Sequence, residues 1–148
     1  MLGENVYLGG MEMSEKVFAA GMRDPLSRKV IGCAIEVHRE LGPGLLESAY
    51  QECLCHELAL NGLKFKKEVW LPVVYKGIKI DCQYRLDIVV EKSLIVEVKA
   101  VEEISGLHEA QLLTYLKMSG MQKGLLLNFN VPFMRDGIKR MVRTKPQP

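Results

Sequence analysis

The sequence predicts an α/β domain in which helices flank a central mixed β-sheet that contains an antiparallel hairpin. Two observations predict this class. Short runs rich in Val, Ile and Leu, with the alternation typical of strands, occupy the middle of the chain. Segments with helical periodicity precede and follow them. We interpret residues 1–23 as a flexible N-terminal extension, and residues 24–148 as one domain that is long enough to bury a sizeable core.

Composition and charge restrict the class of protein. The formal net charge of +2 is too small to establish a nucleic-acid partner by itself. No run approaches the roughly 20 apolar residues needed to cross a membrane, and the N-terminus lacks the apolar core of a secretory signal. We therefore expect a cytoplasmic protein without a membrane partner. No predicted helix carries a second apolar stripe, which predicts a monomer or a weak homodimer.

The four cysteines are predicted to be free thiols rather than metal ligands. Only Cys53 and Cys55 are close in sequence, and they fall inside a predicted helix. Residues two apart on a helix point about 200° away from each other, so this pair is poorly placed to share a metal. In a reducing compartment the cysteines behave as small hydrophobic residues.

The first helix is predicted to begin at Asp24 and Pro25, because Asp is a good N-cap and Pro fits the first helical position. It is predicted to end at Gly42. His38, at the edge of its apolar stripe, is typical of a hydrogen-bonded core histidine. Residues of the stripe recur three and four apart: Val30, Ile31, Ala34, Ile35, His38 and Leu41.

A second helix is predicted from about Leu45 to Asn61, with Tyr50, Leu54 and Leu58 as its buried stripe. Glu47 falls on the same line, one turn before Tyr50. An ionised Glu on an inward face is costly without a partner, which makes Glu47 a candidate functional residue. The alternative is that Glu47 sits in the first turn, favoured by the helix dipole, with its carboxylate in water.

Strand patterning begins after Lys64. The pattern predicts strands at Val69–Tyr75 and Ile78–Ile80, joined by a turn at Lys76-Gly77. Lysines interleaved with aromatic residues in this segment could contact phosphates and stack on bases. Alternatively, the lysines protect an exposed sheet edge. The lysines are Lys64, Lys66, Lys67, Lys76 and Lys79.

The segment Tyr84–Ala100, YRLDIVVEKSLIVEVKA, predicts the central hairpin, with a tight turn at Glu91-Lys92-Ser93. A three-residue loop would pair Val90 with Leu94 and place the apolar sets of both strands on one side of the sheet. Because side chains alternate along a strand, these sets are Leu86, Ile88 and Val90 in the first strand, and Leu94, Val96, Val98 and Ala100 in the second.

The same register sets Asp87 opposite Glu97 and Arg85 opposite Lys99. Opposed like charges destabilise a sheet, and a divalent cation would relieve the repulsion between the two carboxylates. Mg²⁺ or Mn²⁺ suits such oxygen ligands. The alternative is a solvated polar face on which Arg85 and Lys99 neutralise the two acids.

A helix is predicted at about Leu107–Met118, with Gln111 and Tyr115 on one face. A short apolar strand follows at Gly124–Phe129. It is predicted to pair parallel to Leu94–Ala100, because a helical crossover separates the two strands.

The tail Phe133–Arg143 is predicted to be weakly helical. A basic terminal helix is consistent with phosphate contact, although charged terminal helices are also common in proteins without that role. Its basic residues are Arg135, Lys139, Arg140 and Arg143.

Several of these segments resemble a known family. Asp87 followed by Glu97-Val98-Lys99 resembles the D…(D/E)xK signature of the PD-(D/E)XK nuclease superfamily. Gly44–Tyr50, GLLESAY, resembles the motif of one small-protein branch, the GxxExxY proteins. The resemblance covers roughly Ser27–Val142. Further matching segments are Ile35–Gly44, Tyr75–Gly77, Ala110–Leu116 and Leu125–Val131.

The resemblance implies a restriction-endonuclease-like core and a Mg²⁺- or Mn²⁺-dependent nuclease. It implies that Asp87 and Glu97 hold the metal, with the Val98 carbonyl as a further ligand. Glu47 would complete the metal shell directly or through water, and Lys99 would position the attacking water. The proline of the superfamily's name is absent, because Leu stands before Asp87, but this change removes no ligand.

Gln111 and Tyr115 resemble the QxxxY element of some superfamily branches, in which the glutamine orients the site or its bound water. The alternative is a glutamine hydrogen-bonded to a strand end. Candidate nucleic-acid contacts are Lys64, Lys66, Lys67, Arg85, Tyr115, Arg140 and Arg143.

Three classes of function follow from these observations. The first is a metal-dependent nuclease, with DNA expected as the substrate in preference to RNA. The second is a catalytically silent nuclease fold that binds nucleic acid or a protein partner. The third is a metal-independent structural protein, in which the acidic pair is only a source of strain.

Overall fold

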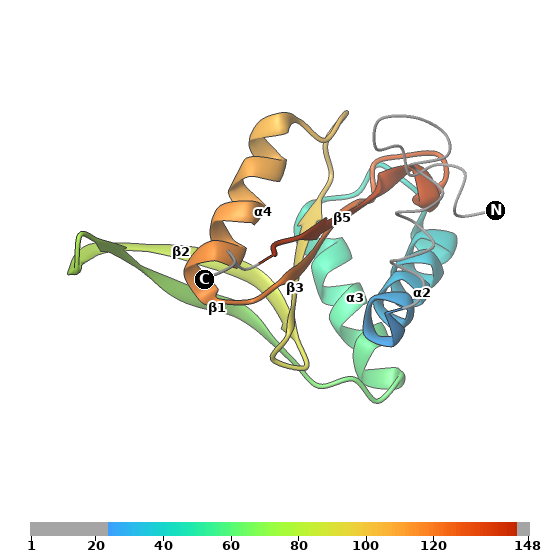
Figure 1. The fold of residues 1–148 in the computed structure, drawn as a ribbon. Coiled ribbons are helices and arrows are strands. Elements are labelled where there is room, and N and C mark those ends of the chain that lie inside the picture. The colour runs from blue at the N-terminus through green and yellow to red at the C-terminus, as the bar shows by residue number, and fades with distance from the viewer. Residues whose placement is uncertain (1–23, 145–148) are drawn as a thin grey trace.

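The computed structural model describes residues 24–144, so the predicted extension at residues 1–23 lies outside the described part. Helices and strands follow one another along the chain as Figure 1 shows. They are α2 (Pro25–Leu41), α3 (Glu47–Leu60), β1 (Phe65–Tyr75), β2 (Ile78–Val90), β3 (Leu94–Lys99), α4 (Gly106–Ser119), β4 (Lys123–Asn128), the 3-10 turn η2 (Met134–Gly137) and β5 (Ile138–Val142).

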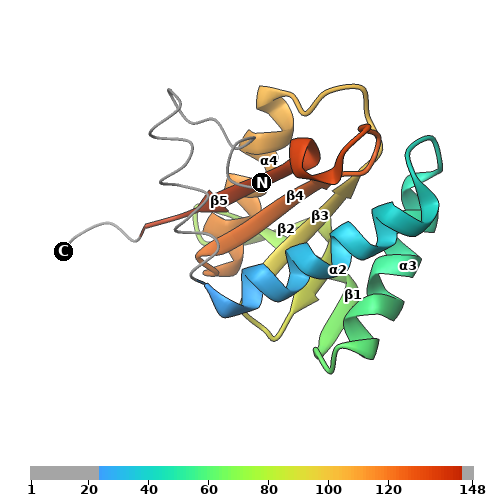
Figure 2. The ribbon, with the colours of Figure 1, turned by 90° about the vertical axis from the view of Figure 1, so that its right-hand side faces the viewer.

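The strands form one five-stranded sheet in the order β1-β2-β3-β4-β5. The predicted parallel pairing is confirmed: β4 runs parallel to β3, and α4 makes the crossover between them. The other neighbours are antiparallel. Helices α2 and α3 cover one face of the sheet and α4 covers the other (Figure 2). The outer half of the β1–β2 hairpin projects beyond the helices (Figure 1). The predicted mixed sheet flanked by helices is therefore confirmed.

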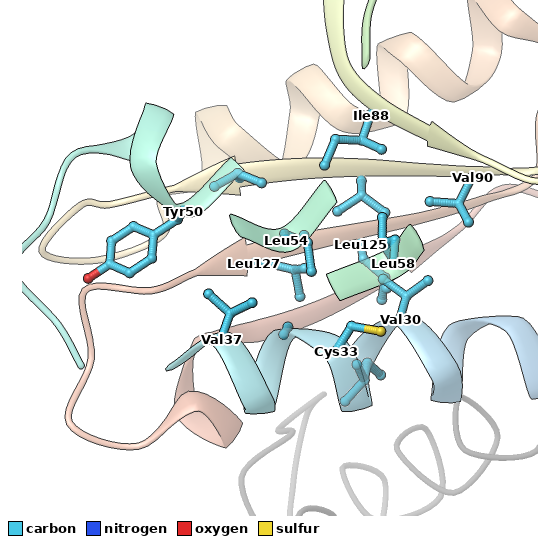
Figure 3. Close-up of a cluster of buried hydrophobic side chains, with 14 of the residues drawn as sticks. Val30, Cys33, Val37, Tyr50, Leu54, Leu58, Ile88, Val90, Leu125 and Leu127 are labelled. Atoms are coloured by element: carbon cyan, nitrogen blue, oxygen red, sulfur yellow. The ribbon is translucent and has the colours of Figure 1, made fainter. Parts of the chain in front are cut away.

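The larger core lies between α2, α3 and the sheet (Figure 3). Tyr50 is its largest fully buried side chain, and its ring stacks on Phe129 with centroids 4.6 Å apart. The Tyr50 hydroxyl donates to the carbonyl of Gly42 and accepts from the backbone N–H of Leu45. The predicted stripe of α3 is thus confirmed, and Tyr50 also fixes the loop that delivers Glu47 to the start of α3.

The smaller core lies between α4 and the opposite face of the sheet. One of its members shows an error in the predicted hairpin face. Leu86 packs in this α4 core, whereas Ile88, two residues later, packs in the α2–α3 core. The change of face coincides with Glu68, which has φ 55° and, like Asp87, is missing from the regular β1–β2 ladder. Such irregularities redirect side chains in a sheet, and this one lies at Asp87.

The predicted helical tail is wrong. Phe133–Arg143 contains only the short turn η2 and then strand β5, which pairs antiparallel with β4. Strand β4 would otherwise be an unpaired sheet edge. Alternation along β5 buries Ile138 in the α2–α3 core and packs Met141 against the α4 core, and a helix could not do both.

The η2–β5 junction yields a stability prediction. A Cβ on the buried Gly137 would lie 1.9 Å from the carbonyl oxygen of Asn128, so the backbone would have to move. Gly137→Ala is expected to lower the free energy of unfolding by about 3 kcal/mol in urea denaturation. Gly106→Ala is the matched control, because a Cβ there meets nothing within 4 Å. Equal stability of the two variants would contradict the close approach.

Candidate functional site

The site begins with the tight turn between β2 and β3. The loop at residues 91–93 pairs Val90 with Leu94, and the backbone N–H of Ser93 donates to the Val90 carbonyl over 3.0 Å. Pairing continues to Ile88 and Val96. The predicted three-residue loop and its register are confirmed up to this row.

At the next row, carboxylates take the place of the ladder hydrogen bonds. The Asp87 backbone N–H donates to Glu97 Oε2 over 2.9 Å. The Val98 backbone N–H donates to Asp87 Oδ2, also over 2.9 Å. Each acid is therefore held by the backbone of the strand opposite it. Asp87 and Glu97 lie side by side, as the predicted register requires.

Burial raises the free energy needed to ionise both carboxyls of this pair. Glu97 is only 4% exposed, and burial together with the charge of Asp87 raises its pKa to about 8. Burial also raises the pKa of Asp87, while the hydrogen bond from Val98 and the charge of Lys99 oppose the rise. A buried carboxylate this close to a half-buried one is destabilised unless a proton or a cation offsets the two charges.

Lys99 and Glu47 complete the charged group. Lys99 is half-buried and lies two residues after Glu97 in β3. Its positive charge opposes the rise in the pKa of both acids. Glu47 is the first residue of α3, and its Oε2 accepts from the backbone N–H of Ala100 over 3.4 Å. Its side chain is exposed rather than inward, yet its charge raises the pKa of Asp87. The start of α3 and the end of β3 thus bring a third carboxylate into electrostatic reach of the pair.

Helix α4 adds a polar wall. Tyr115 is buried, and its pKa is raised to about 12, first by burial and then by the charges of Glu97 and Asp87. A hydrogen bond with the exposed side chain of Gln111 partly opposes this rise. The structure therefore brings Tyr115 into electrostatic reach of the acidic pair and places Gln111 beside Tyr115.

Residues 24–141 match a family model described as the PD-(D/E)XK nuclease superfamily. The chain belongs to the PD-(D/E)XK nuclease superfamily. No curated protein and no solved structure shows significant similarity to the chain. The mixed sheet and its flanking helices are consistent with the superfamily fold. The narrower resemblance to the GxxExxY proteins stays a prediction.

Superfamily members generally use divalent metals, and the donor atoms at this site fit such an ion. Asp87, Glu97 and Glu47 offer carboxylate oxygens, which Mg²⁺ and Mn²⁺ prefer. Within residues 24–144, no three His, Cys, Asp or Glu side chains already converge into a metal-binding group. The close approach of the buried Glu97 and the half-buried Asp87, rather than a preformed cage, is therefore the observation that fits a cation.

The cysteines form no disulfide bonds, and His38 lies in the core. All four cysteines are free, and burial raises the thiol pKa of Cys33 and Cys55 to about 11. His38 is buried, and its Nε2 lies 2.7 Å from the Val131 carbonyl oxygen, as expected of a core histidine. None of the helices in the described part of the chain has the length and hydropathy needed to span a membrane.

The basic residues predicted to contact nucleic acid are dispersed. Lys64 and Lys66 are exposed near the β2–β3 turn, at the opposite end of the hairpin from the acidic pair. The Lys64 backbone N–H donates to the turn residue Glu91 over 2.6 Å. Lys67 forms an ion pair with Glu52 of α3 over 2.8 Å. These lysines are therefore not gathered around the acids.

Two further pairs involve the predicted arginines. Arg85 lies 3.5 Å from Glu68 of β1. Arg140 in β5 lies 4.0 Å from Asp24 at the start of α2, which places it on the face opposite α4. Arg143 follows β5, and its backbone N–H donates to the carbonyl of Gln122. Of the predicted basic contacts, Arg85 is the one whose charge opposes the rise in the pKa of both carboxyls.

Sequence reasoning missed three residues that contact the candidate site or its supporting segments. Asn128 is buried, and its amide bonds both the N–H and the carbonyl of Val101, which holds the chain leaving β3. The sequence feature that could have identified Asn128 is its place as the polar last residue of the apolar strand β4. Gln51 of α3 donates to the Asp87 carbonyl over 3.4 Å, and Tyr84 packs against Tyr115. No local pattern marks these last two.

Proposed function

We propose that the chain is a divalent-metal-dependent nuclease that hydrolyses phosphodiester bonds of DNA. One observation carries the proposal: Asp87, half-buried, and Glu97, buried, are held side by side by each other's strands, with Lys99 adjacent. Membership of a nuclease superfamily supports it and implies a nucleic-acid substrate. A scaffold without a ligand gains nothing from burying two carboxylates together.

Asp87 and Glu97 would hold Mg²⁺ or Mn²⁺, with the Val98 carbonyl as a further ligand and Glu47 binding directly or through water. When bound, such an ion supplies positive charge to the scissile phosphate and lowers the pKa of a bound water. Lys99 orients the attacking water and offsets negative charge on the phosphate.

The amide of Gln111 would orient the attacking water or the phosphate from the α4 side. Its contact with Tyr115, which the α4 core fixes in place, restricts where that amide can point. Positioning of this kind is a general source of rate acceleration, because the reacting groups need not find one another.

The direct test is metal binding, because it requires no assumed substrate. Isothermal titration of Mn²⁺ into the full chain is expected to show saturable binding, with Kd at or below roughly 1 mM. Glu97→Gln is expected to abolish this binding, since the amide keeps the size of the side chain and removes its charge.

The matched control is Asp81→Asn, which alters an exposed carboxylate of the same strand β2 and is expected to bind Mn²⁺ like the wild type. Circular dichroism establishes that each variant is folded. If the wild type bound no Mn²⁺ at roughly millimolar concentration, the proposal would fail, and the silent binding module would be the better interpretation.

A further inference from the structure

A hollow of about 420 Å³ opens between β2 and α4. Tyr84, which lines it from β2, stands three residues before Asp87. Tyr115 lines the hollow from α4, and the charges of Glu97 and Asp87 contribute to its raised pKa. Tyr115 therefore connects the hollow to the candidate active site, because it lines the hollow and lies within electrostatic reach of both acids.

Aromatic surface and hydrogen-bonding groups line this hollow. The Tyr84 ring is 37% exposed and leans on Tyr115 at 51°, with centroids 5.5 Å apart. Gln111 presents an exposed amide. Thr114 donates its hydroxyl proton to the Ala110 carbonyl, which leaves its oxygen as an acceptor.

His108 adds a donor of fixed position. Its Nδ1 accepts from the Ser105 backbone N–H over 3.0 Å, as part of the box that caps α4. The neutral ring therefore carries its proton on Nε2. A stacking ring with donors and acceptors beside it matches a flat heteroaromatic group whose edge carries both, and a nucleobase is such a group.

Leu107 stands at the edge of the same hollow and is 78% exposed. A single exposed leucine needs no explanation by itself. Beside a hollow that takes up a base, however, Leu107 would occupy the gap that the unstacked base leaves between its neighbours, as apolar side chains do in other complexes.

We propose that this hollow, the base pocket, receives one unstacked nucleobase next to the scissile phosphate, and that the preferred substrate is single-stranded DNA. Tyr84 stacks on the base, His108 and Thr114 contact its edge, and Leu107 packs where the base left its neighbours. A base in a duplex must first be unpaired and unstacked, which disfavours the duplex. The proposal rests on the proposed function only in placing the scissile phosphate at Asp87 and Glu97.

Fluorescence anisotropy in EDTA measures binding without cleavage. The probes are fluorescein-labelled DNAs of equal length: a single strand, a blunt duplex, and a single strand in which abasic residues replace the bases. The full-length wild type is expected to bind the normal single strand at least about tenfold more tightly than either other probe at one NaCl concentration. This comparison needs no variant, so it stands even if a substitution impairs folding.

Variants then assign the effect to the pocket. Tyr84→Ala and Leu107→Ala are each expected to weaken single-strand binding about tenfold and to leave duplex binding unchanged. Tyr84→Phe, which keeps the ring, and Leu60→Ala, at an exposed leucine at the far end of α3, are expected to bind like the wild type.

The proposal would be overturned by undetectable single-strand binding, by equal affinity for normal and abasic strands, or by Tyr84→Ala behaving like Tyr84→Phe. Base-dependent binding in a protein that takes up no Mn²⁺ and cleaves nothing would support the pocket and end the proposed function. Mn²⁺-dependent cleavage without base-dependent binding would do the reverse.

Discussion

Asp87→Asn is expected to reduce the rate of Mn²⁺-dependent DNA cleavage by about 10³-fold or more. Asn has the size of Asp and keeps an oxygen that can accept from the Val98 N–H, so the strands remain joined. The change removes the negative charge that the proposed metal requires. Single-turnover cleavage of single-stranded DNA with enzyme in excess measures the chemical step without product release.

The control for this loss is Asp81→Asn, an exposed position of β2 that is expected to retain the wild-type rate. A further variant separates metal binding from chemistry. Lys99→Met is expected to lose cleavage but to keep Mn²⁺ binding, because Lys99 supplies positive charge and holds no metal. If Asp87→Asn cleaved as fast as Asp81→Asn, the assigned site would be wrong.

The stability of the protein is expected to fall as the pH rises from about 5 to about 8 because of Glu97. Burial and Asp87 raise the pKa of Glu97 from 4.5 to about 8 in the folded protein. Between these values the folded state holds a proton that the unfolded chain has released, so the free energy of unfolding decreases with pH. Burial also raises the pKa of Asp87, which acts in the same direction.

Glu97→Gln removes the titrating group, so its stability relative to the wild type is expected to increase across this window. The increase should be on the order of 3 kcal/mol between urea denaturation at pH about 5 and at pH about 8. The control is Glu103→Gln, at an exposed glutamate in the loop after β3, whose curve should parallel that of the wild type. If the free energy of unfolding of Glu97→Gln and of the wild type changed with pH in parallel, the folded state would not raise the pKa of Glu97.

Mn²⁺ provides an independent check on the raised pKa of the two carboxyls. A bound cation favours the charged form of both acids, so saturating Mn²⁺ is expected to remove most of the pH dependence in the wild type. It should have no such effect on Glu97→Gln. A pH dependence that Mn²⁺ left unchanged would separate the strain from metal binding.

The central hairpin shows how much of the site was predictable. A period of two along each strand and a three-residue turn leave little freedom in the register, so Val90 pairs with Leu94 and Asp87 meets Glu97. The stripe of α3 at Tyr50, and the parallel partner of β3, were predictable for the same reason. Each follows from spacing along one or two neighbouring segments.

Predictions failed where distant segments decide the outcome. The tail was predicted to be helical from its composition, but Ile138–Val142 pairs as a strand with the edge of β4 that would otherwise be unpaired. Leu86 was assigned to the wrong face because the irregularity beside it, at Asp87, coincides with Glu68 in another strand. Neither the sheet edge nor the left-handed backbone at Glu68 has a local signal in the sequence.

The sequence by itself determined the hairpin, its acidic pair and the lysine beside them, because strand alternation and a short turn are local properties of the chain. Only the tertiary structure decided which other groups share that site. The packing of α3 and α4 on opposite faces of the sheet brings Glu47 to the end of β3 and sets Tyr84 against Tyr115. The same packing buries Glu97, and the depth of that burial gives its carboxyl the raised pKa.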